Sequence, residues 1–326
     1  MRSPLLHFTP AVQETIKNSD CRVVITGVSG WLGQATLEMC EGVFGHHLQE
    51  RVVGISSQPR ELILRSGSVF KSINFDQANL LQGRPSLLAH YAFLTREKVG
   101  NQSLESYVSQ NRNISQQVVS LSKKIGAIGV FSTSSGAVYD KNRILAEDIE
   151  HNPYGVLKLE EEALLQALAS SEATGLSICR LFNLSGPFIH KDFALNSIIK
   201  SLFEKKEIHL KANRKVVRDY IHVEDLVSLG FSMMLDAKNQ YKTPYDTGVG
   251  EEIEVGDLAK RVRSLLGQPD ALIFRPQIIN EEDIYIGNTQ IIKNLFQSYR
   301  LAPKCLDEQI LTTAAYIHEL FSGENI

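Results

Sequence analysis

The sequence predicts an α/β protein: a Rossmann-type doubly wound parallel sheet with a smaller C-terminal α/β substrate-binding lobe. Two observations support this fold class. Strand-length apolar segments alternate with helix-patterned segments through the first half of the chain, and a glycine-rich turn directly follows the first strand. The chain has 326 residues, 43% of them hydrophobic, which is enough for two lobes that each bury a core.

Five apolar or β-branched segments of the first half are expected to form strands, at residues 21–26, 51–55, 68–73, 86–92 and 127–132. Between them, residues 31–41 and 104–124 carry apolar side chains at helical spacing. A further helix over 153–170 and a strand over 176–183 complete this part. The alternation of strand and helix implies parallel pairing with right-handed crossovers.

The periodicity changes after Gly186-Pro187. Helical patterns there are mixed with short strand-like segments; the helices are expected at 195–204, 224–235, 255–266 and 305–321, the strands near 207–210, 245–246 and 271–274. We therefore divide the chain into a leader (residues 1–20), a Rossmann domain (21–185) and a smaller substrate-binding lobe (186–326). Chain exchange between the two lobes is compatible with this division.

The composition argues against several classes of partner. The 34 basic and 37 acidic residues give a formal net charge of -3, so no broad basic field is available for nucleic acid or anionic lipid. No stretch approaches the ~20 consecutive apolar residues of a membrane span, and the chain start lacks the apolar core of a secretory signal. The four cysteines, Cys21, Cys40, Cys179 and Cys305, are widely spaced, which argues against a disulfide framework or a structural zinc site. We expect a cytoplasmic protein without a metal, nucleic-acid or membrane partner.

The first strand runs into the segment TGVSGWLG, where Gly27, Gly30 and Gly33 are spaced three apart before a helix. Gly27 permits a tight turn, Gly30 lets a pyrophosphate approach the backbone, and Gly33 allows close packing of helix on strand. The helix start, with Trp31 and Leu32, offers free N–H groups to the phosphates. The segment therefore predicts dinucleotide binding, although three glycines can also simply shape a loop.

The residues after the second strand bear on the choice between NAD and NADP. A carboxylate there would accept hydrogen bonds from the ribose 2′-hydroxyl, but the chain has Ser56 and Ser57, with Arg60 nearby. Hydroxyls and a cation suit a 2′-phosphate better, which favours NADP slightly; Arg60 can equally be a solvated loop residue. Asp76, at the end of the third strand, is placed either to reach the adenine amino group or to cap a turn.

The segment YGVLK places Tyr154 and Lys158 four residues apart on one helix face. A phenol has a reference pKa near ~10, so we expect Lys158 to supply the cation that favours the phenolate. Tyr154 could then exchange a hydroxyl proton while a hydride moves between substrate and nicotinamide. Upstream, STSSGAVYD ends a strand with hydroxyls, and Ser135, or its rival Ser134, would hydrogen-bond the reacting oxygen.

Five segments in order, TGVSGWLG, the Ser/Thr cluster ending in AVYD, YGVLK, RLFNLSGP and RDYIHVEDL, together resemble the extended short-chain dehydrogenase/reductase family. This family contains the NAD(P)-dependent sugar-nucleotide epimerases and dehydratases, and the match spans about residues 21–236. The resemblance implies that the three glycines bind the cofactor pyrophosphate and that Ser135, Tyr154 and Lys158 are catalytic. It places further residues along the cofactor: Asp76, Tyr91, Ala92 and Asn113.

Toward the substrate, the resemblance implies that Asn183 of RLFN contacts it and that Arg218 of RDYIHVEDL binds a diphosphate. Two departures from the family pattern bear on the reaction. Gly136-Ala137 stands where family dehydratases carry an acid, which disfavours elimination of water. Arg275 lies earlier than the family's second phosphate-clamping arginine, so either Arg275 moves in on binding or the substrate carries no nucleotide.

We therefore expect an NAD(P)-dependent epimerase or ketoreductase that acts on a nucleotide sugar, with the choice between these two reactions left open. The alternatives are an NADP-dependent reductase of a non-sugar hydroxy or keto compound and a non-catalytic dinucleotide-sensing protein. A homodimer is also expected, because helices 104–124 and 154–170 carry more apolar surface than one sheet face needs and relatives pair through them.

Overall fold

In the computed structural model, which describes residues 3–172, 174–190, 193–236 and 242–322, six strands pair in parallel in the order β12-β7-β6-β5-β1-β2. They are β1 (Arg22–Thr26), β2 (Val52–Ile55), β5 (Ser86–His90), β6 (Ala127–Ser135), β7 (Gly175–Leu181) and β12 (Tyr245–Asp246). The strand order reverses at β1, which leaves a crevice at the carboxyl ends of β1 and β5. The predicted doubly wound sheet is confirmed.

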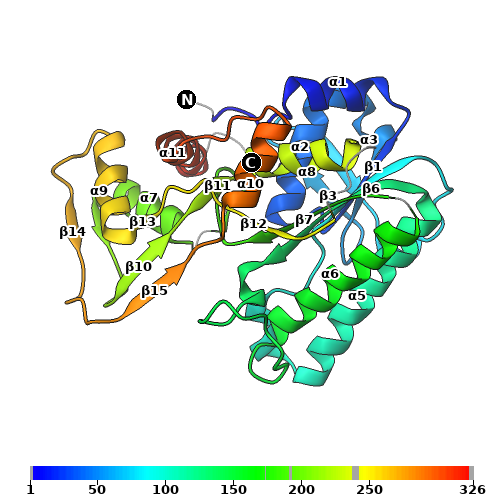
Figure 1. The fold of residues 1–326 in the computed structure, drawn as a ribbon. Helices are drawn as coiled ribbons and strands as arrows, with labels where there is room; N and C mark the ends of the chain where they lie inside the picture. Colours follow the sequence, from blue (N-terminus) through cyan, green and yellow to red (C-terminus); the bar gives the residue numbers. More distant parts are fainter. Residues whose placement is uncertain (1–2, 173, 191–192, 237–241, 323–326) are drawn as a thin grey trace.

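Helices cover both faces of this sheet (Figure 1). One face carries α5 (Leu104–Ile125) and α6 (Pro153–Ser171), and the other carries α2 (Trp31–Phe44) and α8 (Val223–Leu235), with α1 (Pro10–Asn18) packed on these two helices. Val118 and Leu121 of α5 and Leu165 of α6 are buried with Val24 and Leu88 of the sheet. This burial of apolar stripes on both faces holds the strand ends in fixed positions.

The leader packs against α2 and α8. The backbone N–H of Leu6 donates to Glu38 Oε1 at 2.7 Å, and the ring of Phe8 lies 4.6 Å from that of Phe231. Pro10 opens α1, where its missing N–H costs no helical hydrogen bond. The leader therefore covers an apolar face of the Rossmann part, a role that its sequence did not reveal.

The strand expected at 68–73 was wrongly placed in the parallel sheet. It forms β4 (Val69–Ser72), which pairs antiparallel with β3 (Arg60–Ile63) in a separate hairpin. The few residues between β3 and β4 are too short for a parallel crossover, which needs a dozen or more. The other short elements of this half are η1 (Gly45–His47), α3 (Leu48–Arg51), α4 (Phe75–Ala78), η2 (Arg96–Asn101) and η3 (Gly136–Val138).

The smaller lobe lies beside the carboxyl edge of the central sheet (Figure 1). Its helices are α7 (Ala194–Lys205), α9 (Val255–Leu265) and α11 (Leu306–Ser322), and its strands are β9 (Glu207–His209), β10 (Lys215–Arg218), β13 (Ile253–Glu254), β14 (Leu272–Phe274) and β15 (Glu282–Tyr285). At the junction, β8 (Asn183–Ser185) pairs in parallel with β11 (Tyr220–His222). The chain crosses between the lobes, since α8, β12 and α10 (Gln290–Ser298) pack with the Rossmann part.

Candidate active site

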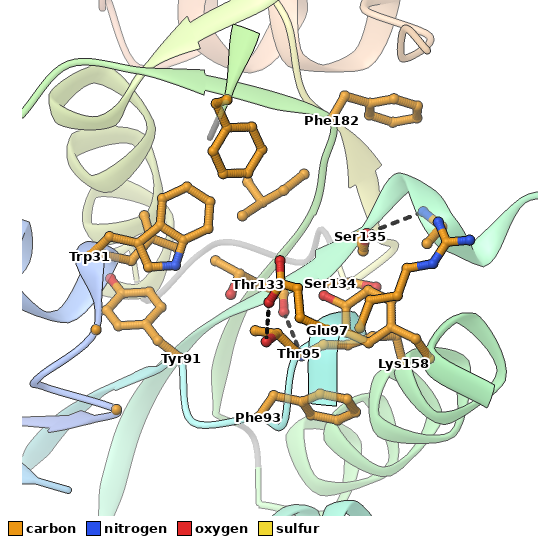
Figure 2. Close-up of a pocket in the computed structure, with 18 of the residues that line it drawn as sticks. Trp31, Tyr91, Phe93, Thr95, Glu97, Thr133, Ser134, Ser135, Lys158 and Phe182 are labelled. Carbon is orange, nitrogen blue, oxygen red and sulfur yellow. Dashed lines mark hydrogen bonds between the residues drawn. The ribbon is translucent and has the colours of Figure 1, made fainter. Parts of the chain in front are cut away.

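A cavity of about 650 Å³ opens at the carboxyl ends of β1, β5 and β6. The glycine turn, the segment after β5 and the end of β6 line its Rossmann side, and Arg218, Asp283 and Tyr285 line the side of the smaller lobe. Figure 2 shows Trp31 and Tyr91 on one side of this cavity and Ser135 and Lys158 on the other. The predicted glycine turn and the predicted catalytic residues therefore face one space.

The glycine turn has the shape that a dinucleotide requires. Gly27 has φ of 70°, and a Cβ there would lie 2.8 Å from the backbone nitrogen of Ala92. A Cβ at Gly33 would collide with the carbonyl of Gly27, so helix and turn pack backbone to backbone. Helix α2 begins at Trp31 with Gly30 as its N-cap and no side-chain cap, which leaves N–H groups of its first turn for phosphate oxygens. These residues fit a bound NAD(P).

The segment that follows β5 forms the wall opposite the turn. Thr26 Oγ1 accepts from the backbone N–H groups of Tyr91 and Ala92, both at 3.3 Å. The phenol of Tyr91 is hydrogen-bonded to Thr36 at 2.9 Å. Tyr91 and Ala92 thus line the cavity next to Gly27, as the resemblance implied for a cofactor wall.

Three predicted adenosine contacts do not line the cavity. The Ser56 hydroxyl is buried and donates to the carbonyl of Gln58 at 2.6 Å, so the hairpin uses it. Arg60 is exposed on β3, where its guanidinium donates to Ser57 Oγ at 3.4 Å. Asp76 is exposed in the first turn of α4, which is capped by another residue, Asn74.

The asparagine expected near the nicotinamide, Asn113, is exposed on α5 and does not line the cavity. Asn111 is the buried one: its Oδ1 accepts from the backbone N–H of Leu94 at 2.8 Å. Tyr107, one turn earlier, donates its phenol proton to the Leu94 carbonyl at 2.8 Å. Asn111 therefore fixes the segment after β5 that lines the cavity. Its burial could have been predicted from the sequence, because it lies four residues after Tyr107 and so on the same, apolar face of the helix.

Tyr154 and Ser135 meet inside the cavity. Tyr154 lies in the first turn of α6, which Asn152 caps by accepting from the backbone N–H of Gly155 at 3.0 Å. Ser135 ends β6, and its side chain is close enough to the Tyr154 phenol to lower the pKa of that phenol. Ser134 is also buried and lines the cavity, and its hydroxyl has no hydrogen-bond partner among the described residues. Two hydroxyls and a phenol are thus available to a substrate oxygen.

Lys158 lies one turn later on α6, and its ammonium group contacts other residues of the chain. Its Nζ donates to the Thr133 carbonyl at 3.0 Å and to Glu161 Oε2 at 2.8 Å, and it lies 3.7 Å from the centre of the Phe93 ring. The effect of this cation on the pKa of Tyr154 stays a prediction. Burial, with the charges of Glu161 and Glu97, raises the pKa of Tyr154 to about 12, against the lowering effect of Ser135. The phenol is therefore protonated at neutral pH.

The smaller lobe contributes two residues that sequence reasoning missed, both from β15. Asp283 accepts two hydrogen bonds from the Arg218 guanidinium, each at 3.1 Å. Tyr285, two residues on, lines the cavity together with Ser135, and its phenol is close enough to Ser135 for that side chain to lower its pKa. The sequence signal that could have predicted them is their spacing of two residues, which places both side chains on one face of a strand.

Two predicted substrate residues, Asn183 and Arg275, do not line the cavity. Asn183 is buried, and its amide donates to the carbonyls of Asp219 at 3.2 Å and Tyr285 at 3.0 Å, so it links β8 to β11 and β15. Arg275 does not line the cavity: its guanidinium donates to both carboxylate oxygens of Glu254, at 2.7 and 2.9 Å. This ion pair directs Arg275 to the N-terminus of α9 instead of toward the cavity.

A family model described as the NAD dependent epimerase/dehydratase family matches residues 23–250, which include the glycine turn, Ser135, Tyr154, Lys158 and Arg218. The chain belongs to this family. Members are NAD-dependent enzymes, so the expected enzyme class is confirmed. Among the described residues, no cluster of metal-ligating side chains is found, and no helix has the length and apolar character needed to cross a membrane.

Similar proteins agree with this membership. A UDP-glucose 4-epimerase from Mycoplasma pneumoniae is 27% identical over 233 residues, which cover 63% of this chain and 69% of that protein. The crystal structure of a UDP-glucose 4-epimerase from Thermotoga maritima with UDP-glucose covers 92% of this chain and 99% of its own, with a TM-score of 0.70 and 18% identity. A UDP-glucuronic acid 4-epimerase from Bacillus cereus, with UDP-glucuronic acid and NAD, covers the same shares with a TM-score of 0.67 and 18% identity. The two structures support the fold.

Proposed function

We propose that this enzyme is a nucleotide-sugar 4-epimerase that acts on a UDP-hexose. The observation that carries the proposal is that Ser135 and Tyr154 line the same cavity as the glycine turn and Arg218. The names of the similar proteins supply the substrate class and the sugar carbon. A net ketoreductase is the second candidate, because Ser57, which follows β2, and Arg60, the first residue of β3, lie 3.4 Å apart and offer a site for the 2′-phosphate of NADP.

The cofactor would lie on the glycine turn, with its pyrophosphate at the start of α2 and its nicotinamide toward Tyr154 and Lys158. Bound NAD supplies a hydride acceptor that can return the hydride to either face of a keto-sugar. Tyr154 acts as the phenolate: the phenol first releases its proton to water, and the phenolate oxygen then takes the proton of the sugar hydroxyl and gives it back in the second half of the reaction. Ser135 and Ser134 hold the reacting oxygen beside that phenol.

At the other end of the cavity, Arg218 would bind the diphosphate. In the structure it is paired with Asp283, so the diphosphate has to replace that carboxylate. Arg275 is not assigned to the diphosphate, because Glu254 holds it elsewhere. Asn183 would act on the substrate indirectly, through the Tyr285 carbonyl that it contacts.

Incubation of the purified protein with UDP-glucose, UDP-galactose, UDP-glucuronic acid and UDP-N-acetylglucosamine tests the function, with the products separated by chromatography. We expect interconversion of at least one C4 pair without net change in nicotinamide absorbance. Stoichiometric oxidation or reduction of added cofactor would instead indicate the ketoreductase. No conversion of any nucleotide sugar would contradict both.

We also propose a homodimer that pairs through α5 and α6. A shallow hollow on the outer side of α5, lined by Leu104, Val108 and Arg112, supports this arrangement, as does the half-exposed Leu164 on α6. Light scattering should give twice the mass of the 36.4 kDa chain. A monomer at working concentration would contradict the proposal.

A further inference from the structure

A chain of buried polar side chains runs from Lys158 to the glycine turn. Lys158 Nζ donates to Glu161 Oε2 at 2.8 Å, Glu161 Oε1 is 2.9 Å from His90 Nε2, and His90 Nδ1 is 2.6 Å from Thr26 Oγ1. Lys158, Glu161, His90 and Thr26 are each at most 4% exposed. Thr26 is the last residue of β1, directly before Gly27, so the chain joins the two halves of the proposed active site.

Glu161 is the centre of this chain. Its Oε1 also accepts from the Ser115 hydroxyl at 3.1 Å, so both carboxylate oxygens are hydrogen-bonded. Although burial raises the pKa of Glu161, the charges and hydrogen bonds of Lys158 and His90 lower it to about 2. A buried carboxylate with this many donors stays ionised at any pH at which the enzyme works.

The position of Glu161 determines what Lys158 can do. The ammonium has three near neighbours, the Glu161 carboxylate, the Thr133 carbonyl and the Phe93 ring, which fix Nζ in place. Its positive charge is partly offset by Glu161 at contact distance, which weakens its stabilisation of a phenolate on Tyr154.

We propose that Glu161 is a positioning residue that fixes Lys158 and offsets part of its charge, which favours the protonated form of Tyr154. This inference rests on the proposed function of Tyr154 and extends it.

Other ionisable groups near Tyr154 come from three further elements: Glu97 on η2, Tyr107 on α5 and Tyr285 on β15. The Glu97 carboxylate is exposed and accepts from Thr95 Oγ1 at 2.7 Å, so water screens its charge. Tyr107 and Tyr285 are neutral at working pH, because burial raises the pKa of each phenol. Glu161 is the fully buried carboxylate of this set, and its charge is therefore the least screened.

The test is Glu161→Gln, which keeps the shape and removes the charge. The ultraviolet absorbance of tyrosinate is titrated in the NAD-loaded protein, and the signal of Tyr154 is isolated by subtracting the same titration in a Tyr154→Phe background. We expect Tyr154 to ionise at lower pH in E161Q by about half a unit or more, and the acid limb of kcat against pH to move the same way. The matched control is Glu160→Gln, since Glu160 is an exposed neighbour that pairs with Arg112 and should leave both readouts unchanged.

An E161Q protein that folds, binds NAD and titrates like the wild type would overturn the proposal. If E161Q does not fold, Glu161→Asp carries the test, because the charge is kept while the carboxylate is withdrawn from Lys158. A lower kcat and a smaller shift of the Tyr154 titration in the same direction, to lower pH, are then expected, and an unchanged titration overturns the proposal. The titration needs no substrate, so it tests this inference separately from the proposed function. If the wild type converts no nucleotide sugar but E161Q still shifts the Tyr154 titration, only the proposed function is refuted.

Discussion

Arg218 and Asp283 form a bidentate ion pair within the smaller lobe, with both guanidinium-to-carboxylate distances at 3.1 Å. Arg218 ends β10 and Asp283 lies on the adjacent parallel strand β15. Burial raises the pKa of Asp283, but the hydrogen bonds and charge of Arg218 outweigh it and hold the pKa below its ordinary value. A diphosphate that binds Arg218 therefore competes with an ionised carboxylate.

Replacement of that carboxylate should strengthen nucleotide binding. For Asp283→Asn we expect the Kd for UDP to fall about two- to fivefold, the range expected for a partly exposed ion pair. Titration calorimetry measures it, with Glu282→Gln as a control because Glu282 pairs with the exposed Lys215. Weaker UDP binding in Asp283→Asn would show that Asp283 itself contacts the nucleotide.

Tyr154→Phe should lower kcat by about 10²–10⁴-fold, because the proton of the sugar hydroxyl then has no acceptor in the cavity. NAD binding, followed by fluorescence quenching, should stay within about twofold of the wild type, since the glycine turn is untouched. Tyr299→Phe is the control: its phenol donates to Asp236 at 3.2 Å, away from the cavity. Full turnover in Tyr154→Phe would remove Tyr154 from the chemistry.

Arg60→Ala should raise the Kd for NADP about tenfold and leave that for NAD unchanged, because only NADP carries the 2′-phosphate that a guanidinium can bind. The measurement compares the two cofactors on both proteins. Equal effects on NAD and NADP, or no effect on either, would contradict the proposed site at the end of β2.

His222 should make stability depend on pH. Burial, with the nearby charge of Lys304, lowers the pKa of His222 from 6.5 to about 3. As pH falls below 6.5, the unfolded chain binds a proton that the folded chain does not, so stability decreases between pH 6.5 and about 3. His222→Gln cannot take up this proton, so its urea midpoint should fall less steeply over that window than the wild-type midpoint. Parallel slopes would show that His222 titrates alike in both states.

The sequence could predict the Rossmann part because its signals are local. A glycine turn between strand and helix, and a Tyr154–Lys158 pair at i, i+4, each define their own geometry, and parallel strand ends bring Ser135 to the same edge. Two residues were misplaced because their positions depend on features that the sequence does not define locally. Asn113 depends on which face of the helix is buried, and the buried asparagine is Asn111, two residues earlier. Ser56 depends on the pairing of the β3–β4 hairpin, to which it is hydrogen-bonded.

The rest of the site could not be predicted because distant segments build it. Asp283 and Tyr285 arrive on a four-residue strand in a lobe with weak periodicity. Glu161 follows Lys158 by three residues, yet its role depends on His90, which another strand brings to it through packing of α6 on the sheet.

The most direct test of the proposed hydride transfer uses a UDP-hexose that carries deuterium at C4 of the sugar. The account predicts that nuclear magnetic resonance finds the deuterium still at C4 in the epimerised product, because the hydride that leaves this carbon returns to it. Loss of the deuterium to water during epimerisation, or the absence of any epimer, would contradict it.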